Sequence, residues 1–142
     1  MSKLRAPQID TGTGANQIVE LDSSSRLPAV DASQVTNVPY TPVPINTDAT
    51  TNRTLVLGDA GEYVRMTNAG ANTVTVPLNS SVAFAIGTEI IVRQAGAGAT
   101  TIVATGGVTI NTPNTLVLAG QHETVSLIKV GTDEWDLTGA TV

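Results

Sequence analysis

Residues 62–79, "EYVRMTNAGANTVTVPLN", decide the fold class of this chain. Two short apolar runs flank the small-residue turn "NAGAN". In the second run, Val74, Val76 and Leu78 alternate with polar residues, which is the pattern of a strand with one buried face. Valine and threonine, which branch at Cβ, also suit a pleated strand better than a helix. The stretch therefore predicts two strands separated by a tight turn.

The same pattern of short apolar runs separated by turns continues over the rest of the chain. Turn sequences such as "GDAG", "AGAGA", "TPN" and "GTDE" separate the apolar runs. Further strands are expected at 53–58, 88–94, 99–105, 108–111, 115–120, 124–130 and 134–139. The segment 80–87 is too short for a helix and is expected to be a loop anchored by Phe84. Many short strands with such turns are typical of an all-β fold, so we expect an antiparallel β-sandwich or barrel-like domain over residues 50–142.

The first third of the chain has a different character. Five of the seven prolines lie within the first 50 residues, and their density excludes a helix or a central strand across 28–44. The stretch 38–46, "VPYTPVPIN", predicts an extended, polyproline-like chain. Residues 16–22, "NQIVELD", could form one short strand. We therefore assign residues 1–49 to an extended N-terminal arm and oligomerisation stem.

Composition excludes several classes of function. The chain has 142 residues and no cysteine, which rules out a disulfide framework and a thiolate metal site. The net charge is −5, and no basic patch is available to neutralise phosphates, so we expect no nucleic-acid partner. The N-terminal "MSKLRAPQID" lacks the apolar core of a signal peptide. No run approaches the roughly 20 apolar residues of a membrane-spanning helix, so we expect no membrane partner.

The sequence shows no catalytic constellation. His122 is the single histidine and has no partner cluster around it in the sequence. The glycine-rich pieces "GTGAN" and "AGAGA" lack the strand-to-helix context and the GK[ST] ending of a phosphate loop. No G-x-S-x-G motif is present. We expect a non-enzymatic protein with no catalytic residue, no cofactor and no metal.

The acidic residues concentrate only at 133–136, "DEWD". Carboxylates can hold a hard cation, but this spacing is not that of an ion-binding loop. The favoured interpretation is that Asp133 and Glu134 cap a turn while Trp135 and Leu137 point into the core. Trp135 would then lock its hairpin to the core by burying a large area. The alternative, an exposed tryptophan that stacks on a sugar, is weaker because such surfaces gather several aromatic residues.

Four blocks of the chain resemble structural proteins of tailed phages. They are "NQIVELDSSSRLPAVDASQVTNV" (16–38), "TNRTLVLGDAGEYVRMTNAGANTVTVP" (51–77), "GTEIIVRQAGAGATTIVATGGVTIN" (87–111) and "SLIKVGTDEWDLTG" (126–139). The first block is similar to a segment of phage fibre and head-accessory proteins, and the others look like their C-terminal β-domain. The pattern is typical of phage virion accessory proteins as a class, and it occurs in both capsid decoration proteins and tail fibres.

The resemblance implies a homotrimer, and the residues of the stem agree with this. Apolar side chains in 16–45 are too sparse to form a core within one chain, whereas three copies around an axis could bury them together. The expected oligomer or capsid interface consists of Ile18, Leu21, Leu27, Val30 and Val35.

The resemblance further implies a capsid decoration (cement) protein or head fibre. It would bind the phage major capsid protein as a trimer and stabilise the shell, on the outer surface of a capsid assembled in the host cytoplasm. The head is favoured over the tail because the chain has room for only one arm and one domain. The alternative is a short tail fibre or tail adaptor, whose receptor-binding surface would lie on the β-domain around Trp135 or Tyr63. A third hypothesis, a carbohydrate-active enzyme, requires two carboxylates across a cleft.

Overall fold

A computed structural model describes residues 42–142, which belong to one compact unit. These residues form nine strands and one 3-10 helix: β1 (Ile45–Asp48), β2 (Asn52–Thr54), η2 (Leu57–Asp59), β3 (Tyr63–Met66), β4 (Asn72–Val76), β5 (Glu89–Gln94), β6 (Thr100–Ala104), β7 (Thr109–Asn111), β8 (Thr124–Gly131) and β9 (Glu134–Gly139). The all-β prediction is confirmed for this part of the chain. A search of the same residues finds no helix that could span a membrane.

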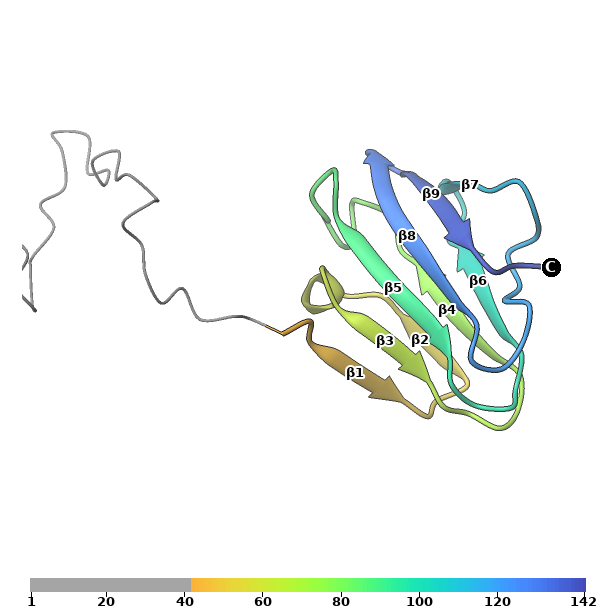
Figure 1. Cartoon of the computed structure of the whole chain (residues 1–142). Helices are drawn as coiled ribbons and strands as arrows, with labels where there is room; N and C mark the ends of the chain where they lie inside the picture. The colour runs from red at the N-terminus through yellow and green to blue at the C-terminus, as the bar shows by residue number, and fades with distance from the viewer. Residues whose placement is uncertain (1–41) are drawn as a thin grey trace, which may run out of the picture. The chain divides into compact units, whose positions relative to one another are not determined.

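The chain coils through three stacked rungs, each of which adds one strand to each of two facing sheets (Figure 1). The rungs are β1–β2, β3–β4 and β5–β6. Strands at equivalent places in successive rungs pair in parallel: β1 with β3 and β3 with β5 in one sheet, β2 with β4 and β4 with β6 in the other. This arrangement is β-solenoid-like.

The expected antiparallel pairing is therefore wrong for the three rungs. The turns "NAGAN" and "AGAGA" do not close hairpins; each carries the chain from a strand of the large sheet to a strand of the small sheet. Period-two alternation reports that one face of a strand is buried, and it is the same for parallel and antiparallel neighbours. Local pattern could thus predict the strands but not the direction in which they pair.

Among the named strands of residues 42–142, antiparallel pairing is limited to the two pairs that contain β8. β8 runs antiparallel to β5, β9 runs antiparallel to β8, and β7 pairs in parallel with β9. The large sheet has the order β1-β3-β5-β8-β9-β7, and the small sheet has the order β2-β4-β6 (Figure 1). The β8–β9 hairpin covers the third rung of the large sheet, while β1 has an edge that no other strand of residues 42–142 pairs with.

The hydrophobic core lies between the two sheets. Along most of β3, β4, β5, β8 and β9, buried inward positions alternate with half-exposed or exposed outward positions. The buried apolar side chains are Leu55, Val64, Met66, Val74, Val76, Phe84, Ile90, Val92, Ile102, Leu118, Val125, Leu127, Trp135 and Leu137. Phe84 anchors the loop between β4 and β5, as the sequence predicted. With so few aromatic residues, branched aliphatic side chains supply most of the packing.

At one corner of the stack, the backbones of two rungs touch. A Cβ atom on Gly98 would overlap the backbone of Gly70, and one on Gly96 would overlap the backbone of Thr67 and Asn68. Glycine is needed at these two positions because only a bare backbone permits this approach. The two glycine-rich turns are therefore adjacent layers of one corner.

Hydrogen bonds between buried polar side chains hold the two rungs together at the same corner. The Thr100 hydroxyl donates to Asn72 Oδ1 at 2.8 Å, and the Thr100 amide donates to Gln94 Oε1 at 3.1 Å. All three residues are at most 3% exposed. Because these polar groups are satisfied by one another, they fix the register between rungs at little cost of desolvation.

The folded unit begins earlier than the boundary at residue 50. β1, at Ile45–Asp48, pairs with β3 along its whole length, although the sequence placed these residues in the stem. β1 starts directly after Pro44, so the prolines limit the strand at its N-terminal end without interrupting it. The run 115–120 forms only isolated bridges, at Val117 and Leu118.

Candidate functional site

In the first rung, polar residues occupy the inward positions and close the end of the hydrophobic core. Asn46 stands in register with Val64, and Asp48 with Met66, so both occupy inward positions. On the small sheet, Arg53 takes the inward position that Val74 takes in the next rung. Solenoids need such a terminal layer, because an apolar end would expose the core.

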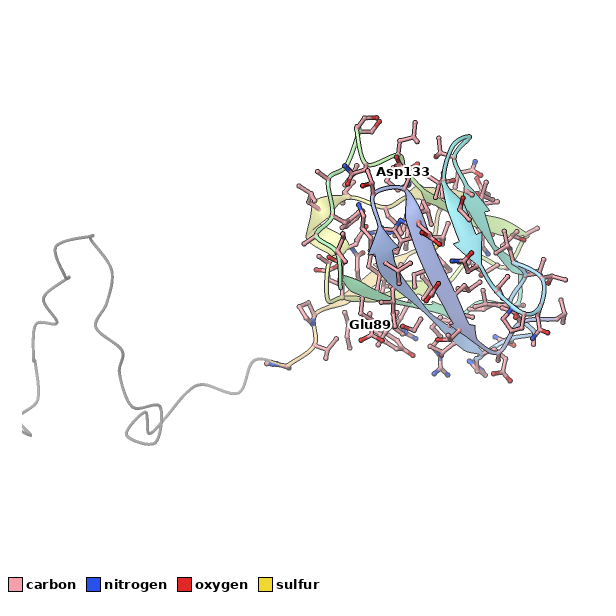
Figure 2. All side chains as sticks on the ribbon, turned by 90° about the horizontal axis from the view of Figure 1, so that it is seen from above. Glu89 and Asp133 are labelled. Carbon is pink, nitrogen blue, oxygen red and sulfur yellow. The ribbon has the colours of Figure 1, made fainter. Side chains whose placement is uncertain are left out.

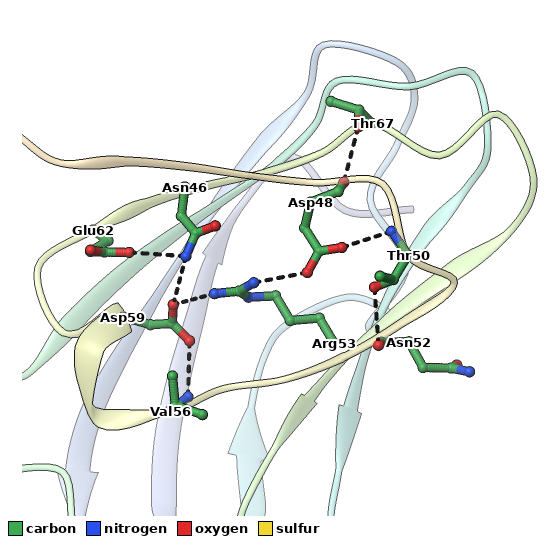
Figure 3. Close-up of polar contacts among 9 residues, drawn as sticks. All are labelled: Asn46, Asp48, Thr50, Asn52, Arg53, Val56, Asp59, Glu62 and Thr67. Carbon is green, nitrogen blue, oxygen red and sulfur yellow. Dashed lines mark hydrogen bonds and ion pairs between the residues drawn. The ribbon is translucent and has the colours of Figure 1, made fainter.

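Arg53 organises this layer into a closed network (Figure 3). Its Nη1 atom lies 2.8 Å from Asp48 Oδ2, and its Nη2 atom forms an ion pair with Asp59 Oδ1. Asp59 is 1% exposed, and its second oxygen accepts the Val56 amide at 2.9 Å. Asn46 Nδ2 lies 3.4 Å from both Asp59 Oδ1 and Glu62 Oε2. The 3-10 helix that carries Asp59 is thereby tied to both strands of the first rung.

The pKa values of Asp48 and Arg53 reflect this pairing. Burial raises the pKa of Asp48, but hydrogen bonds from Thr50 and Arg53 outweigh burial and bring the pKa below its usual value. Burial lowers the pKa of Arg53, but its hydrogen bonds and charge interactions with Asp48 and Asp59 outweigh that effect and raise it. Asp48 and Arg53 are therefore both charged at neutral pH, and the network serves as a structural cap.

The outer face of the large sheet carries a different set of polar residues. Thr47, Arg65, Arg93 and Thr124 stand in register on β1, β3, β5 and β8. We call these four residues the arginine row. Their chain neighbours Val64, Met66 and Val92 are fully buried, so the arginine row points outward. It lies on the opposite side of the sheet from the core.

Arg65 and Arg93 have no carboxylate partner within residues 42–142. In this range, ion pairs form only at Arg53. The remaining cation there, Lys129, is 2% exposed and donates to Asn79. Like charges that stand opposite each other on neighbouring strands are destabilising. The protein has a net negative charge, yet two guanidinium groups without carboxylate partners in this range stand side by side on this face. This arrangement indicates a functional role for the face.

Tyr63 forms a hydrogen bond with the arginine row. Arg93 Nη1 donates to Tyr63 Oη at 3.2 Å. Burial would raise the pKa of Tyr63, but hydrogen bonds with Arg93 and Thr124 and the charges of Arg93 and Arg65 lower it. Arg93 therefore contacts the phenol oxygen directly, and the charge of Arg65 also favours the ionised form.

An apolar row lies beside the arginine row on the same face. It consists of Ile45, Tyr63 and Ile91, which stand in register on β1, β3 and β5. Ile45 is 67% exposed, whereas Tyr63 and Ile91 are half-buried. The outer face near the free edge of β1 thus combines an apolar stripe with an adjacent cationic stripe.

Of the three carboxylates at 133–136, Glu134 and Asp136 meet at Asn111, whereas Asp133 lies apart from them. Asp133 accepts the Asn79 amide at 2.6 Å, while Glu134 and Asp136 both accept from Asn111 Nδ2. Across residues 42–142, no group of three or more His, Asp and Glu side chains is placed to hold a metal ion. Asp133 in the β8–β9 turn and Glu89 on β5 are well separated (Figure 2). Glu89 itself accepts the Ser126 hydroxyl at 2.6 Å.

Trp135 and Leu137 point into the core, as the favoured interpretation predicted. Trp135 is 1% exposed and meets the ring of Phe84 edge-on, with 5.4 Å between ring centroids. Lys129 Nζ lies 5.8 Å from the tryptophan ring. Trp135 therefore cannot stack on a sugar at the surface, and the hairpin is locked as expected.

His122 lies in the turn before β8, with a φ of 73°. It is exposed, and its backbone amide donates to Gln94 O at 2.6 Å. The expected interface residues Ile18, Leu21, Leu27, Val30 and Val35 lie outside the described residues.

Sequence reasoning missed both the first-rung network and the arginine row. A signal for the arginine row was present, because "VR" occurs at 64–65 and again at 92–93 within apolar runs. Its meaning depends on parallel pairing, which places Arg65 opposite Arg93. Comparison with models of protein families and with curated proteins yields no match.

Proposed function

We propose that this protein is a non-enzymatic structural component of a tailed-phage virion. In the favoured form it is a capsid decoration (cement) protein or head fibre that binds the major capsid protein as a homotrimer and stabilises the shell. The resemblance of four sequence blocks to phage accessory proteins supports the class. Three of these blocks contain or overlap every strand of the described domain except β1.

One structural observation carries the proposal: the outer face of the large sheet pairs an apolar row with two arginines that lack carboxylate partners within residues 42–142. A face of this composition suits contact with another macromolecule, because apolar area supplies affinity and desolvated charge supplies specificity. A decoration protein acts in many copies, so weak contacts at each copy sum to a large stabilisation of the shell.

The trimer belongs to the same proposal. The stem residues Ile18, Leu21, Leu27, Val30 and Val35 have too few apolar neighbours in sequence to be covered within one chain. Three stems around an axis would cover one another and would present three β-domains to the shell. Each domain would then contribute one copy of the outer face to the assembly.

A second function, a short tail fibre or tail adaptor that binds a receptor, is favoured by the surroundings of Tyr63. This half-buried phenol lies beside Arg65 and Arg93 on an outward face, and together they offer a ligand both an aromatic ring and positive charge. Trp135, the other residue considered for such a surface, is buried.

Copy number per virion separates the two functions. Quantitative mass spectrometry of purified virions would compare this protein with the major capsid protein. A copy number in the hundreds supports decoration, whereas about a dozen copies supports a tail appendage. Particles stripped of the protein should also disrupt at lower temperature, and purified protein added back should restore the original temperature. Stripped particles with unchanged stability would contradict the cement function.

A further inference from the structure

Within residues 42–142, the backbone of β1 offers an unpaired strand edge next to the arginine row. The amides of Tyr63 and Thr67 donate to the carbonyls of Pro44 and Asp48, so alternate residues of β1 face β3. The backbone groups of Ile45 and Thr47 therefore point the other way, towards the free edge. β1 is the terminal strand of the large sheet, and no other strand of residues 42–142 pairs with this edge.

Free edges are normally blunted by charge, proline or cover, because they template pairing with another chain. The outward side chains on β1 are instead Ile45 and Thr47, which are uncharged and exposed. The charged side chain of this strand, Asp48, points inward and is held by Arg53. The first rung therefore closes the core with charge yet leaves its strand edge open to pairing.

We propose that this edge binds an extended, carboxylate-bearing segment of a partner protein. The segment would add a strand along β1 and place a carboxylate over the small side chain of Thr47, against Arg65 and Arg93. Its apolar side chains would contact Ile45. The same contact would form whether the protein is located on a capsid or on a tail.

Three observations favour a polypeptide over a polysaccharide. The edge supplies backbone hydrogen bonds at strand spacing, which a peptide can match residue by residue. Guanidinium groups bind carboxylates in a fork geometry, and a strand presents such side chains on alternate residues. The apolar row offers aliphatic contact with only one aromatic residue, whereas sugar-binding surfaces usually gather several.

Other charged groups around the face do not neutralise the arginines. Glu89 is on the same strand as Arg93 but four residues away, about 13 Å at strand rise, and is bound to Ser126. Glu62 is within hydrogen-bond distance of Asn46 in the first rung. Glu123 is next to Thr124 in sequence but forms no ion pair with Arg93. The cationic stripe is therefore available to an acidic partner.

The test uses two polymers that carry the same charged group on different backbones. Full-length protein would be titrated at low ionic strength with fluorescently labelled poly-L-glutamate and with labelled polygalacturonate. We expect poly-L-glutamate to bind the parent protein and to be released by added salt. The double variant Arg65→Gln/Arg93→Gln should bind it about tenfold or more weakly, as expected for the loss of charge-assisted hydrogen bonds.

Two further variants separate the contribution of the strand edge to binding from the contribution of the arginine charges. Thr47→Pro removes the outward amide of β1 without touching a bond to β3, since proline is tolerated on edge strands, and should also weaken binding. Thr138→Gln changes the same sheet face on β9, away from the edge, and should bind like the parent protein. Thermal unfolding of each variant verifies that the domain is folded.

Three results would overturn the proposal. One is the absence of poly-L-glutamate binding to the parent protein, and another is equal binding by the double variant or by Thr47→Pro. The third is polygalacturonate binding as tight as that of poly-L-glutamate, which would assign the face to an acidic glycan.

Discussion

Arg53 and Asp59 form an ion pair inside the first rung, where Arg53 takes the inward position that Val74 takes in the next rung. Asp59 is 1% exposed, and the Nε atom of Arg53 is buried without a hydrogen-bond partner among the described residues. The pair therefore stands in a largely desolvated place, where each partner depends on the other. Removing one partner of the ion pair should lower the stability of the domain.

Replacing Arg53 with leucine should lower the free energy of unfolding by about 3 kcal/mol or more, because Asp59 would remain as an uncompensated buried charge. The double variant Arg53→Leu/Asp59→Asn should lose less than the single variant. Chemical denaturation measures both. Arg65→Leu is the matched control, since Arg65 points outward and has no ion pair in this domain; it should change stability by roughly 0.5 kcal/mol or less. Equal effects of Arg53→Leu and Arg65→Leu would contradict a buried cap.

Asp48 should make the stability depend on acid pH. Its pKa in the folded protein is below the ordinary value of 3.8, so its contribution is fully present above that value and is lost as pH falls towards the folded pKa. Asp48→Asn should therefore be less stable than the parent at neutral pH. The difference between the two proteins should shrink as pH falls below about 4. Denaturation at a series of pH values measures this difference, and a difference independent of pH would contradict the assignment.

Tyr63 should ionise more readily than a free tyrosine because of the arginine row. The chain has two tyrosines, so Tyr40→Phe leaves Tyr63 as the sole reporter. In that background, Arg93→Gln should raise the pKa of Tyr63, since it removes a donor and a positive charge that favour the phenolate. Ultraviolet titration of the phenol follows the change. Thr138→Gln serves as the control and should leave the titration curve in place.

Gly98 should not tolerate a side chain. Gly98→Ala forces a Cβ atom onto the backbone of Gly70, so the two rungs must separate at the corner. The expected loss is about 2–3 kcal/mol in the free energy of unfolding, the upper range for overpacking. Gly106→Ala is the matched control because a Cβ atom there meets nothing within 4 Å. If both variants unfold at the same denaturant concentration, the rungs are not in contact at this corner.

Much of the secondary structure could be predicted from local pattern. Val74 and Val76 alternate with threonine, and both are buried on one face of β4. The expected strands at 88–94, 99–105, 124–130 and 134–139 correspond to β5, β6, β8 and β9 within a residue or two. The burial of Trp135 and Leu137 was also predictable, because they alternate with charged residues after a turn. These features depend on side-chain chemistry and spacing, which the sequence states directly.

The arginine row and the first-rung network could not be predicted in this way. Arg65 and Arg93 are 28 positions apart and become neighbours only because β3 and β5 pair in parallel, in one register. Asp48, Arg53 and Asp59 meet because a 3-10 turn carries Asp59 back between the two strands of the first rung.

The sequence by itself determined that this protein is built from short strands with one buried face, that its turns need small residues, and that its first third differs in kind from the rest. Only the tertiary structure decided that the strands stack as rungs, that the core ends in an ion-paired layer, and that two arginines share an open face beside a free edge. The physical reason is that alternation and turn chemistry act between residues close in the chain, whereas pairing partner and register are chosen by the packing of the whole domain.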